Sequence, residues 1–216
     1  MKLSKRTIEI LQNFSDINPG IVIEPGRDIQ TMSIFNRGFA KAQIEETLPK
    51  KISIYALPEF LGVLSIFREP DIEFDDKFLT ITEGQNSIKY YYANESTIKT
   101  VPAGKSINIA NIDMSFTLTK HMLSQINKTS SIMKFDVIGI SSKGVRAFIS
   151  KIANSTTNVY HINTPVITES TDEAKIRIAD LKIIPGDYTV EVDLRGLVRL
   201  TNVEHPELVY FIVLEK

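Results

Sequence analysis

The sequence predicts an α+β protein made of two similar halves, each with antiparallel sheet and two helices. Two observations carry this prediction. An amphipathic helical stretch followed by a β-hairpin opens the chain, and the same order of parts returns near its middle. The second stretch begins at Leu118 and the first at Leu3, so the offset is 115 residues (118 − 3) in a chain of 216.

The first helix is predicted from Leu3 to about Phe14, because apolar residues recur there at helical spacing. One side of this helix is expected to be buried, and the opposite side carries charge. The buried side holds Leu3, Thr7, Ile10, Leu11 and Phe14; the other holds Lys2, Lys5, Glu9 and Gln12, with Arg6 on the flank.

The second helix is predicted from Leu118 to about Ser131, and residues 117–134 contain no Asp or Glu. Such a face is either an ordinary solvated surface or a surface kept positive to lie near phosphate. The apolar stripe is assigned to Leu118, Met122, Leu123, Ile126 and Met133; the polar face to Lys120, Ser124, Asn127, Lys128 and Ser131, with His121 beside them.

Short alternating runs separated by Gly, Pro and Asn predict the strands. In the first half they are 20–23, 28–35, 39–45, 51–56, 71–74, 78–82 and 87–93, with a short apolar helix at 59–67 that begins near Pro58. In the second half they are 107–116, 135–140, 145–149, 159–162, 175–178, 187–193, 197–201 and 208–214, with a short helical turn at 180–184.

A polar stretch from about residue 94 to 105 is the predicted linker, which gives domains of residues 1–104 and 105–216. Hydrophobic content of 43% and a net charge of −1 are those of an ordinary globular protein. The absence of Cys excludes disulfides and fits a reducing cytoplasm. No apolar run approaches the roughly 18–20 residues of a membrane span.

Catalytic and metal-binding patterns are not indicated. The three His, at positions 121, 161 and 205, show no ligand spacing, and no metal or cofactor is expected. The run 102–106 (PAGKS) resembles the end of a phosphate-binding loop, but Lys99 stands where that loop needs its first glycine. Acidic residues at 71–76 alternate with Ile72 and Phe74, which predicts a strand with an acidic face.

Several collinear stretches resemble the DNA polymerase sliding clamp, or processivity factor, of T4-type bacteriophages. They extend from the first residue to about Tyr188. No single stretch is a signature of the family, and the resemblance rests on their shared order and spacing. They are MKLSK (1–5), Asn13-Phe14, Ile17-Asn18, Gly20-Ile21, Ile54-Tyr55, Leu57, FLGVLS (60–65), ESTI (95–98) with Pro102, DVIGI (136–140) and LKIIPGDY (181–188).

The resemblance implies a DNA-clamp fold, assembled as a homotrimeric ring that encircles duplex DNA without reading its sequence. It implies no enzymatic activity and no cofactor. The implied partners are double-stranded DNA, further copies of the chain, the C-terminal peptide of the phage DNA polymerase, an ATP-dependent clamp loader and late-transcription factors. The implied location is the cytoplasm of the infected bacterial host.

The residues that the resemblance places toward DNA are basic residues on the two helices. They are Lys2, Lys5, Arg6, Lys120, His121 and Lys128; Gln12 and Ser131 stand where basic residues are expected, so the positive lining is expected to be thin. The pocket for a partner peptide is expected beside the linker, at Ile98, Val101 and Pro102, with Leu208 and Tyr210 as a neighbouring wall.

Two other classes of protein remain open from the sequence. Duplicated β-rich modules with little chemistry also build phage tails and capsids, so a structural or assembly protein is the alternative function. Such a protein has no need of the acid-free, basic stretch at 117–134. An enzyme with an unrecognised site is disfavoured, because no nucleophile, base and orienting group occur together.

Overall fold

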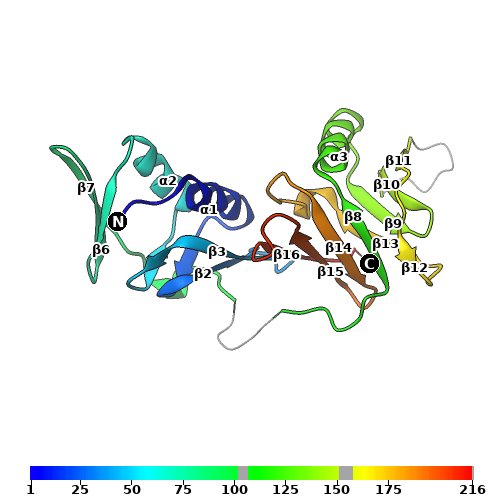
Figure 1. Cartoon of the computed structure of the whole chain (residues 1–216), viewed down its shortest axis with the longest axis horizontal. Helices are drawn as coiled ribbons and strands as arrows, with labels where there is room; N and C mark the ends of the chain where they lie inside the picture. Colours follow the sequence, from blue (N-terminus) through cyan, green and yellow to red (C-terminus); the bar gives the residue numbers. More distant parts are fainter. Residues whose placement is uncertain (102–106, 151–157, 216) are drawn as a thin grey trace. The chain divides into compact units, whose positions relative to one another are not determined.

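A computed structural model describes residues 1–101, 107–150 and 158–215. The chain divides into two compact units, Met1–Lys105 (unit 1) and Ser106–Lys216 (unit 2). Each unit combines antiparallel sheets with helix, so the predicted α+β class is confirmed (Figure 1).

In its described residues unit 1 contains two α-helices and seven strands, which pair antiparallel. Helix α1 packs against β2, β3 and α2, and buries Ile10, Leu11 and Phe14 as its apolar spacing predicts. Strands β1 and β4 pair, β2 pairs with β3, and β5, β6 and β7 form a sheet in that order. The elements are α1 (Lys5–Ile17), β1 (Ile21–Ile23), β2 (Gly26–Met32), β3 (Gly38–Leu48), β4 (Ile52–Ile54), α2 (Leu57–Ser65), β5 (Asp71–Phe74), β6 (Phe78–Glu83), β7 (Asn86–Tyr91) and the 3₁₀ turn η1 (Glu95–Thr97).

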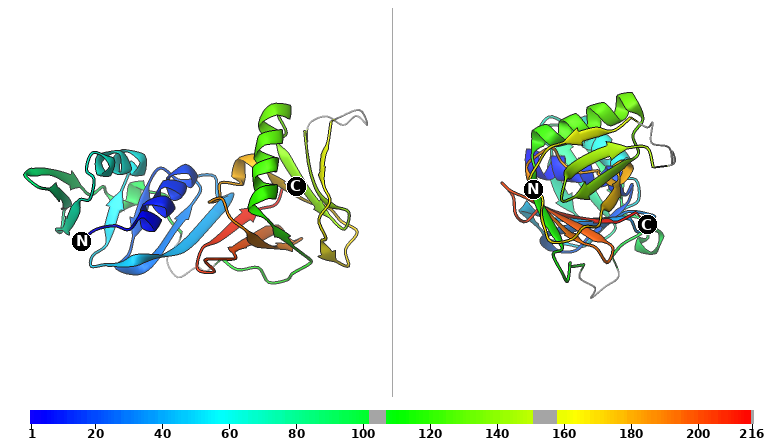
Figure 2. Two further views of the ribbon diagram at one scale, coloured as in Figure 1. Left: turned by 45° about the horizontal axis from the view of Figure 1, so that its top comes forward. Right: turned by 90° about the vertical axis from the view of Figure 1, so that its right-hand side faces the viewer.

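In its described residues unit 2 has one α-helix over a four-stranded sheet, and five further strands that pair with one another. The four-stranded order is β11-β10-β9-β13, and α3 packs against β10 (Figure 2). The five further strands pair in the order β12-β8-β14-β15-β16. The elements are β8 (Met114–Leu118), α3 (Lys120–Met133), β9 (Val137–Ser141), β10 (Gly144–Phe148), β11 (Tyr160–Ile162), β12 (Ile167–Thr168), β13 (Ala174–Arg177), the 3₁₀ turn η2 (Ile178–Asp180), β14 (Tyr188–Asp193), β15 (Leu197–Asn202) and β16 (Val209–Val213).

The prediction of two helices in each half is wrong for unit 2. In its described residues the place of α2 is taken by the three-residue 3₁₀ turn η2, which ends at Asp180. Pro185 disfavours a helical conformation at Ile184, so only a few residues are available for helix before it. Unit 1 instead has Pro58 inside the first turn of α2, where its missing N–H costs nothing.

The strand predicted at 107–116 begins only at Met114. The Asp193 carboxylate accepts the backbone N–H groups of Ala110 and Asn111, each at 3.2 Å, and the Arg195 guanidinium pairs with the same carboxylate at 2.7 Å. These backbone donors are therefore satisfied by a side chain instead of a strand ladder. The bond from Arg195, with these N–H groups, holds the pKa of Asp193 well below its usual range.

The stripe predicted for the second helix is wrong at both ends. Leu118 closes β8, since Thr119 caps α3. Met133 is 38% exposed, and Ser130 takes the buried position instead. Lys134 ends the helix in the left-handed conformation (φ 58°), which turns the chain so that Phe135 is buried.

Candidate nucleic-acid interface

Helices α1 and α3 begin in the same way at positions 115 residues apart (119 − 4). The Ser4 hydroxyl accepts the N–H of Thr7 at 3.1 Å, and the Thr119 hydroxyl accepts the N–H of Met122 at 3.2 Å. The residue after each cap is a lysine, Lys5 or Lys120, and neither helix has an acidic residue in its first turn. A cation is unfavourable there because the helix dipole is positive at that end, so helix stability does not explain these lysines.

Each helix start is instead supplied with a carboxylate from another element. Glu46 of β3 accepts the backbone N–H of Ser4 and, at 2.5 Å, the hydroxyl of Thr7. Asp187, just before β14, accepts the backbone N–H of Lys120 at 2.6 Å. The negative charge that a helix start favours therefore comes from outside, which leaves the first turn itself to a lysine.

The exposed side of α3 is positive along its length. Lys120, His121 and Lys128 are exposed and make no ion pair with any residue that the structure describes. Asn127 and Ser131 lie exposed between and beyond them. This face therefore offers cations and neutral hydrogen-bonding groups to a ligand, without a competing carboxylate on the same helix.

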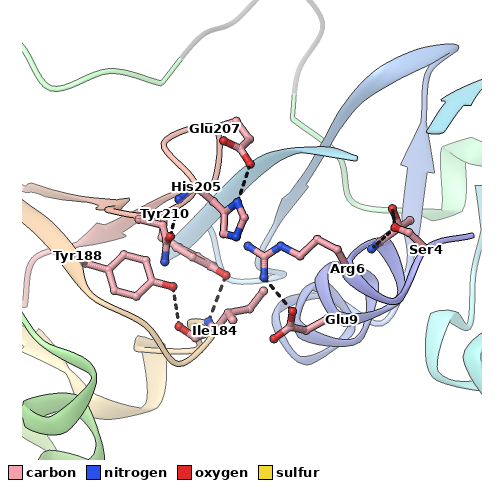
Figure 3. A network of polar contacts seen from close by, with 10 residues as sticks. Ser4, Arg6, Glu9, Ile184, Tyr188, His205, Glu207 and Tyr210 are labelled. Carbon is pink, nitrogen blue, oxygen red and sulfur yellow. Dashed lines mark hydrogen bonds and ion pairs between the residues drawn. The ribbon is translucent and has the colours of Figure 1, made fainter. Parts of the chain in front are cut away.

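Unit 1 offers less positive charge than the sequence suggests. Arg6 donates to Glu9 at 2.8 Å (Figure 3), and Lys2 lies 3.4 Å from Glu69. Among these predicted cations of unit 1, Lys5 alone has no ion pair within the described ranges. Spacing of three residues in a helix makes the Arg6–Glu9 pair foreseeable, whereas Glu69 is 67 residues from Lys2.

The described residues of the predicted partner-peptide pocket are buried. Ile98 and Val101 are 7% and 9% exposed, and a Cβ on Gly20 would lie 3.1 Å from Ile98 Cγ2. Leu208 and Tyr210 are buried in unit 2, where the Tyr210 hydroxyl accepts the N–H of Ile184 at 3.2 Å (Figure 3). Pro102 lies outside the described residues.

Exposed apolar side chains occur at a place that the sequence interpretation assigned to a strand. Residues 33–37 form the turn between β2 and β3, and Phe35 at its tip is 83% exposed. The Ser33 hydroxyl accepts the N–H groups of Arg37 and Gly38, both at 2.9 Å, so the turn is held by its own hydrogen bonds.

Within the described ranges, no cluster of His, Asp or Glu has the makings of a metal site. None of the helices that the structure describes is long and apolar enough to cross a membrane.

Comparison with known proteins gives agreeing results. Residues 2–101 match the family model of the DNA polymerase processivity factor. The chain is 29% identical to the sliding clamp of Vibrio phage KVP40 over 224 residues, covering 100% of this chain and 99% of the relative. It is also 29% identical to the sliding clamp of Enterobacteria phage T4, covering 100% and 97%.

Solved structures agree on the fold. A chain of the PCNA2–PCNA3 complex from Sulfolobus tokodaii superimposes with a TM-score of 0.69 at 11% identity, covering 100% of this chain and 99% of that one. The Helicobacter pylori beta clamp bound to a DNA ligase peptide gives a TM-score of 0.63 at 12% identity, covering 100% and 67%.

The fold and these matches define the class of protein, a DNA sliding clamp, which is a non-enzymatic processivity factor of DNA replication. Within that class, the chain is similar over its full length to the sliding clamps of T4-type bacteriophages.

Proposed function

We propose that three copies of this chain close into a ring around duplex DNA and tether the replicative polymerase for processive synthesis. Each copy contributes two clamp domains, residues 1–104 and 105–216. The observation that carries the proposal is the pair of equivalent helices, each begun by a lysine at an unfavourable position. Two helices per copy give six lysine-led helix starts to face one DNA.

Encirclement makes tight binding unnecessary, because a closed ring leaves DNA only by opening. A lining with many phosphate contacts would bind strongly at low salt and slide poorly. Phosphate contacts also carry no base sequence information. A few basic residues per copy, drawn from Lys2, Lys5, Arg6, Lys120, His121 and Lys128, therefore suit a ring that moves along any sequence.

Two sheets that each end in an edge strand without a further strand among the described residues support head-to-tail closure, and the other edge of each sheet is covered. At the β5 edge, Met1 exchanges hydrogen bonds with Ile72 at 2.7 and 2.9 Å. At the β13 edge, the N–H of Glu215 donates to Lys175 at 2.7 Å. The opposite edges of these two sheets are β7 in unit 1 and β11 in unit 2. Pairing β7 of one copy with β11 of the next joins unlike surfaces, which is the geometry that generates rings.

The proposed protein partners are the C-terminal peptide of the phage polymerase, an ATP-dependent loader and late-transcription factors, in the cytoplasm of the infected host. The peptide site is proposed beside Ile98, Val101 and Pro102, with Leu208 and Tyr210 as a wall. Because the described members of this set are buried, a peptide reaches them only after local opening. The peptide-bound Helicobacter pylori clamp supports a peptide-binding role for this fold.

The first test is the native mass of the purified chain by light scattering. A closed trimer has three times the 24.3 kDa of one chain. A monomer at micromolar concentration would remove the encircling mechanism, and an open-ended assembly would favour the structural-protein alternative.

The second test replaces Lys5, Lys120 and Lys128 together by Glu. Polymerase stimulation on a primed circular template is expected to disappear, because six charge units change on the lining of each copy, while the native mass stays the same. The matched control replaces three other exposed lysines, Lys41, Lys77 and Lys143, by Glu. Equal loss in both variants would attribute the effect to net charge rather than to this face.

A further inference from the structure

Unit 1 has a groove of about 620 Å³ between the start of α1 and the end of α2. The two helices lie side by side in unit 1 (Figure 1). Leu61 and Leu64 of α2 line the groove with Ile8 of α1, and both leucines are largely buried. The groove also takes in Lys2, Lys5, Arg68 and Glu69, so its lining combines an apolar part with three cations and one carboxylate.

The carboxylates near this groove are already engaged. Glu69 pairs with Lys2 at 3.4 Å. Glu83 accepts the backbone N–H of Glu69 at 2.6 Å and that of Arg68 at 3.1 and 3.2 Å. Lys5 and Arg68, in contrast, have exposed side chains and no ion pair in the part of the chain that the structure describes.

The backbone that carries Arg68 is held in place by the Glu83 carboxylate. The N–H groups of Glu69 and Arg68 stabilise the charged form of Glu83 and hold its pKa below its usual range. These bonds join the segment after α2 to strand β6. The main chain at Arg68 is thus fixed, while its guanidinium, whose charge also acts on Glu83, makes no direct ion pair with a described residue. A fixed main chain lowers the ordering cost of binding an anion.

We infer that Lys5 and Arg68 together bind a backbone phosphate of duplex DNA in this groove. The inference rests on the proposed function, since it takes the side of Lys5 to face DNA. Arg68 then supplies the positive charge that Arg6 and Lys2, each paired with a carboxylate, do not provide. A guanidinium suits this role because its fork of N–H donors matches phosphate oxygens.

The test is the salt dependence of binding between the full chain and a labelled short DNA duplex, followed by fluorescence anisotropy. Each phosphate contact contributes about 0.9 to the slope of log K against log salt. Arg68→Gln is expected to lower the magnitude of that slope by about 0.9 for each Arg68 contact removed. Arg68→Lys keeps the charge and is expected to restore most of the slope. Lys41→Gln, a matched loss of one exposed charge in unit 1, is expected to leave the slope as in the original chain.

Several outcomes overturn the inference. An unchanged slope in Arg68→Gln, or an equal change in Lys41→Gln, shows that Arg68 does not contact DNA. If Arg68→Gln weakens binding of the polymerase without DNA and leaves the slope alone, the groove binds an acidic protein segment instead. If inorganic phosphate competes far better than chloride at matched ionic strength, the groove binds the free ion. Absence of any salt-dependent DNA binding in the original chain would overturn this inference alone, because a closed ring holds DNA without tight binding and is tested separately by its native mass.

Discussion

Lys5 and Lys120 occupy the helix position at which a cation is least favourable. At each helix start, a carboxylate from another element, Glu46 or Asp187, accepts a backbone N–H and supplies the favoured negative charge. The repeat makes the two lysines visible in the sequence, because they share one offset. The carboxylates of Glu46 and Asp187 are not visible in this way, since each is far along the chain from the helix it caps. The same separation hides the Lys2–Glu69 pair.

Substitution of Lys134 tests whether its left-handed backbone conformation lowers the stability of the chain. Its φ of 58° places the backbone in the left-handed region, where residues other than Gly and Asn are strained. Lys134→Gly is expected to raise the free energy of unfolding by about 1 kcal/mol. Asn36→Gly is the control, with φ 56° and a smaller expected gain, because Asn tolerates this region. A loss of stability in Lys134→Gly, measured by urea unfolding, would contradict the prediction.

The low pKa of Asp193 predicts that the free energy of unfolding falls at acid pH. Its pKa in the folded chain lies below the ordinary value of 3.8, chiefly through the hydrogen bond from Arg195. The stabilisation is therefore complete above that ordinary value and is lost as the pH falls from there toward the folded pKa. The urea midpoint of Asp193→Asn is expected to change less than that of the original chain over this acid range. Asp28→Asn, which removes an exposed carboxylate, is the control. If the urea midpoint of Asp193→Asn depended on pH as strongly as that of the original chain, the Asp193 carboxylate would not be the source of the acid dependence.

At the level of elements, alternation and turn residues predict most strands, and β5 is predicted to the residue. Three features escape this reasoning for physical reasons. Strand β12 has only two residues, and Ile167 in it is 75% exposed, so no alternation marks it. Residues 107–113 alternate in sequence, but the backbone N–H groups of Ala110 and Asn111 donate to the Asp193 carboxylate instead of to a neighbouring strand. The second helix of unit 2 is cut short before Pro185.

Gly144 tests the hairpin that supports the β11 edge. Its φ is +105°, and a Cβ there would lie 2.7 Å from the carbonyl oxygen of Ile162 in β11. Gly144→Ala is therefore expected to destabilise unit 2 and to displace β11. Gly84→Ala is the matched control, because Gly84 has φ +60° with nothing within 4 Å of the added carbon. Strain alone costs about 1–3 kcal/mol, so an equal loss in both variants would show that the contact with β11 is unimportant.

At the scale of the whole molecule, the proposed ring depends on edge strands whose outward backbone groups pair with a strand of the next copy. Strand β7 pairs with β6 on one side only, and alternate residues of β7 direct their backbone groups toward β6 or away from it. One set is Asn86, Ile88 and Tyr90, and the other is Ser87, Lys89 and Tyr91. The turn at Gly84 and Gln85 closes on the pair Glu83–Asn86, which makes Ser87, Lys89 and Tyr91 the residues whose backbone groups point to the free edge.

Removing one of these edge donors is expected to weaken assembly. Lys89→Pro deletes an outward N–H, and the native mass at low micromolar concentration is expected to fall toward that of one chain. Lys89→Ala keeps the N–H while removing the side chain, including its contact with the Phe78 ring at 4.7 Å, and is expected to keep the assembled mass. Full assembly of Lys89→Pro, with its fold intact by circular dichroism, would exclude β7 as a joining edge.

The Glu46 and Asp187 carboxylates at the two helix starts also have a mechanical consequence. A pull on Lys5 or Lys120 acts on the end of a helix, which in isolation is the part most prone to fray. Here the main chain at that end is held by Glu46 in β3, or by Asp187 at the entrance to β14. If the two lysines face DNA as proposed, drag from a moving duplex would pass through these bonds into the sheets. Each helix could then unwind from this end only after its hydrogen bond to Glu46 or Asp187 breaks.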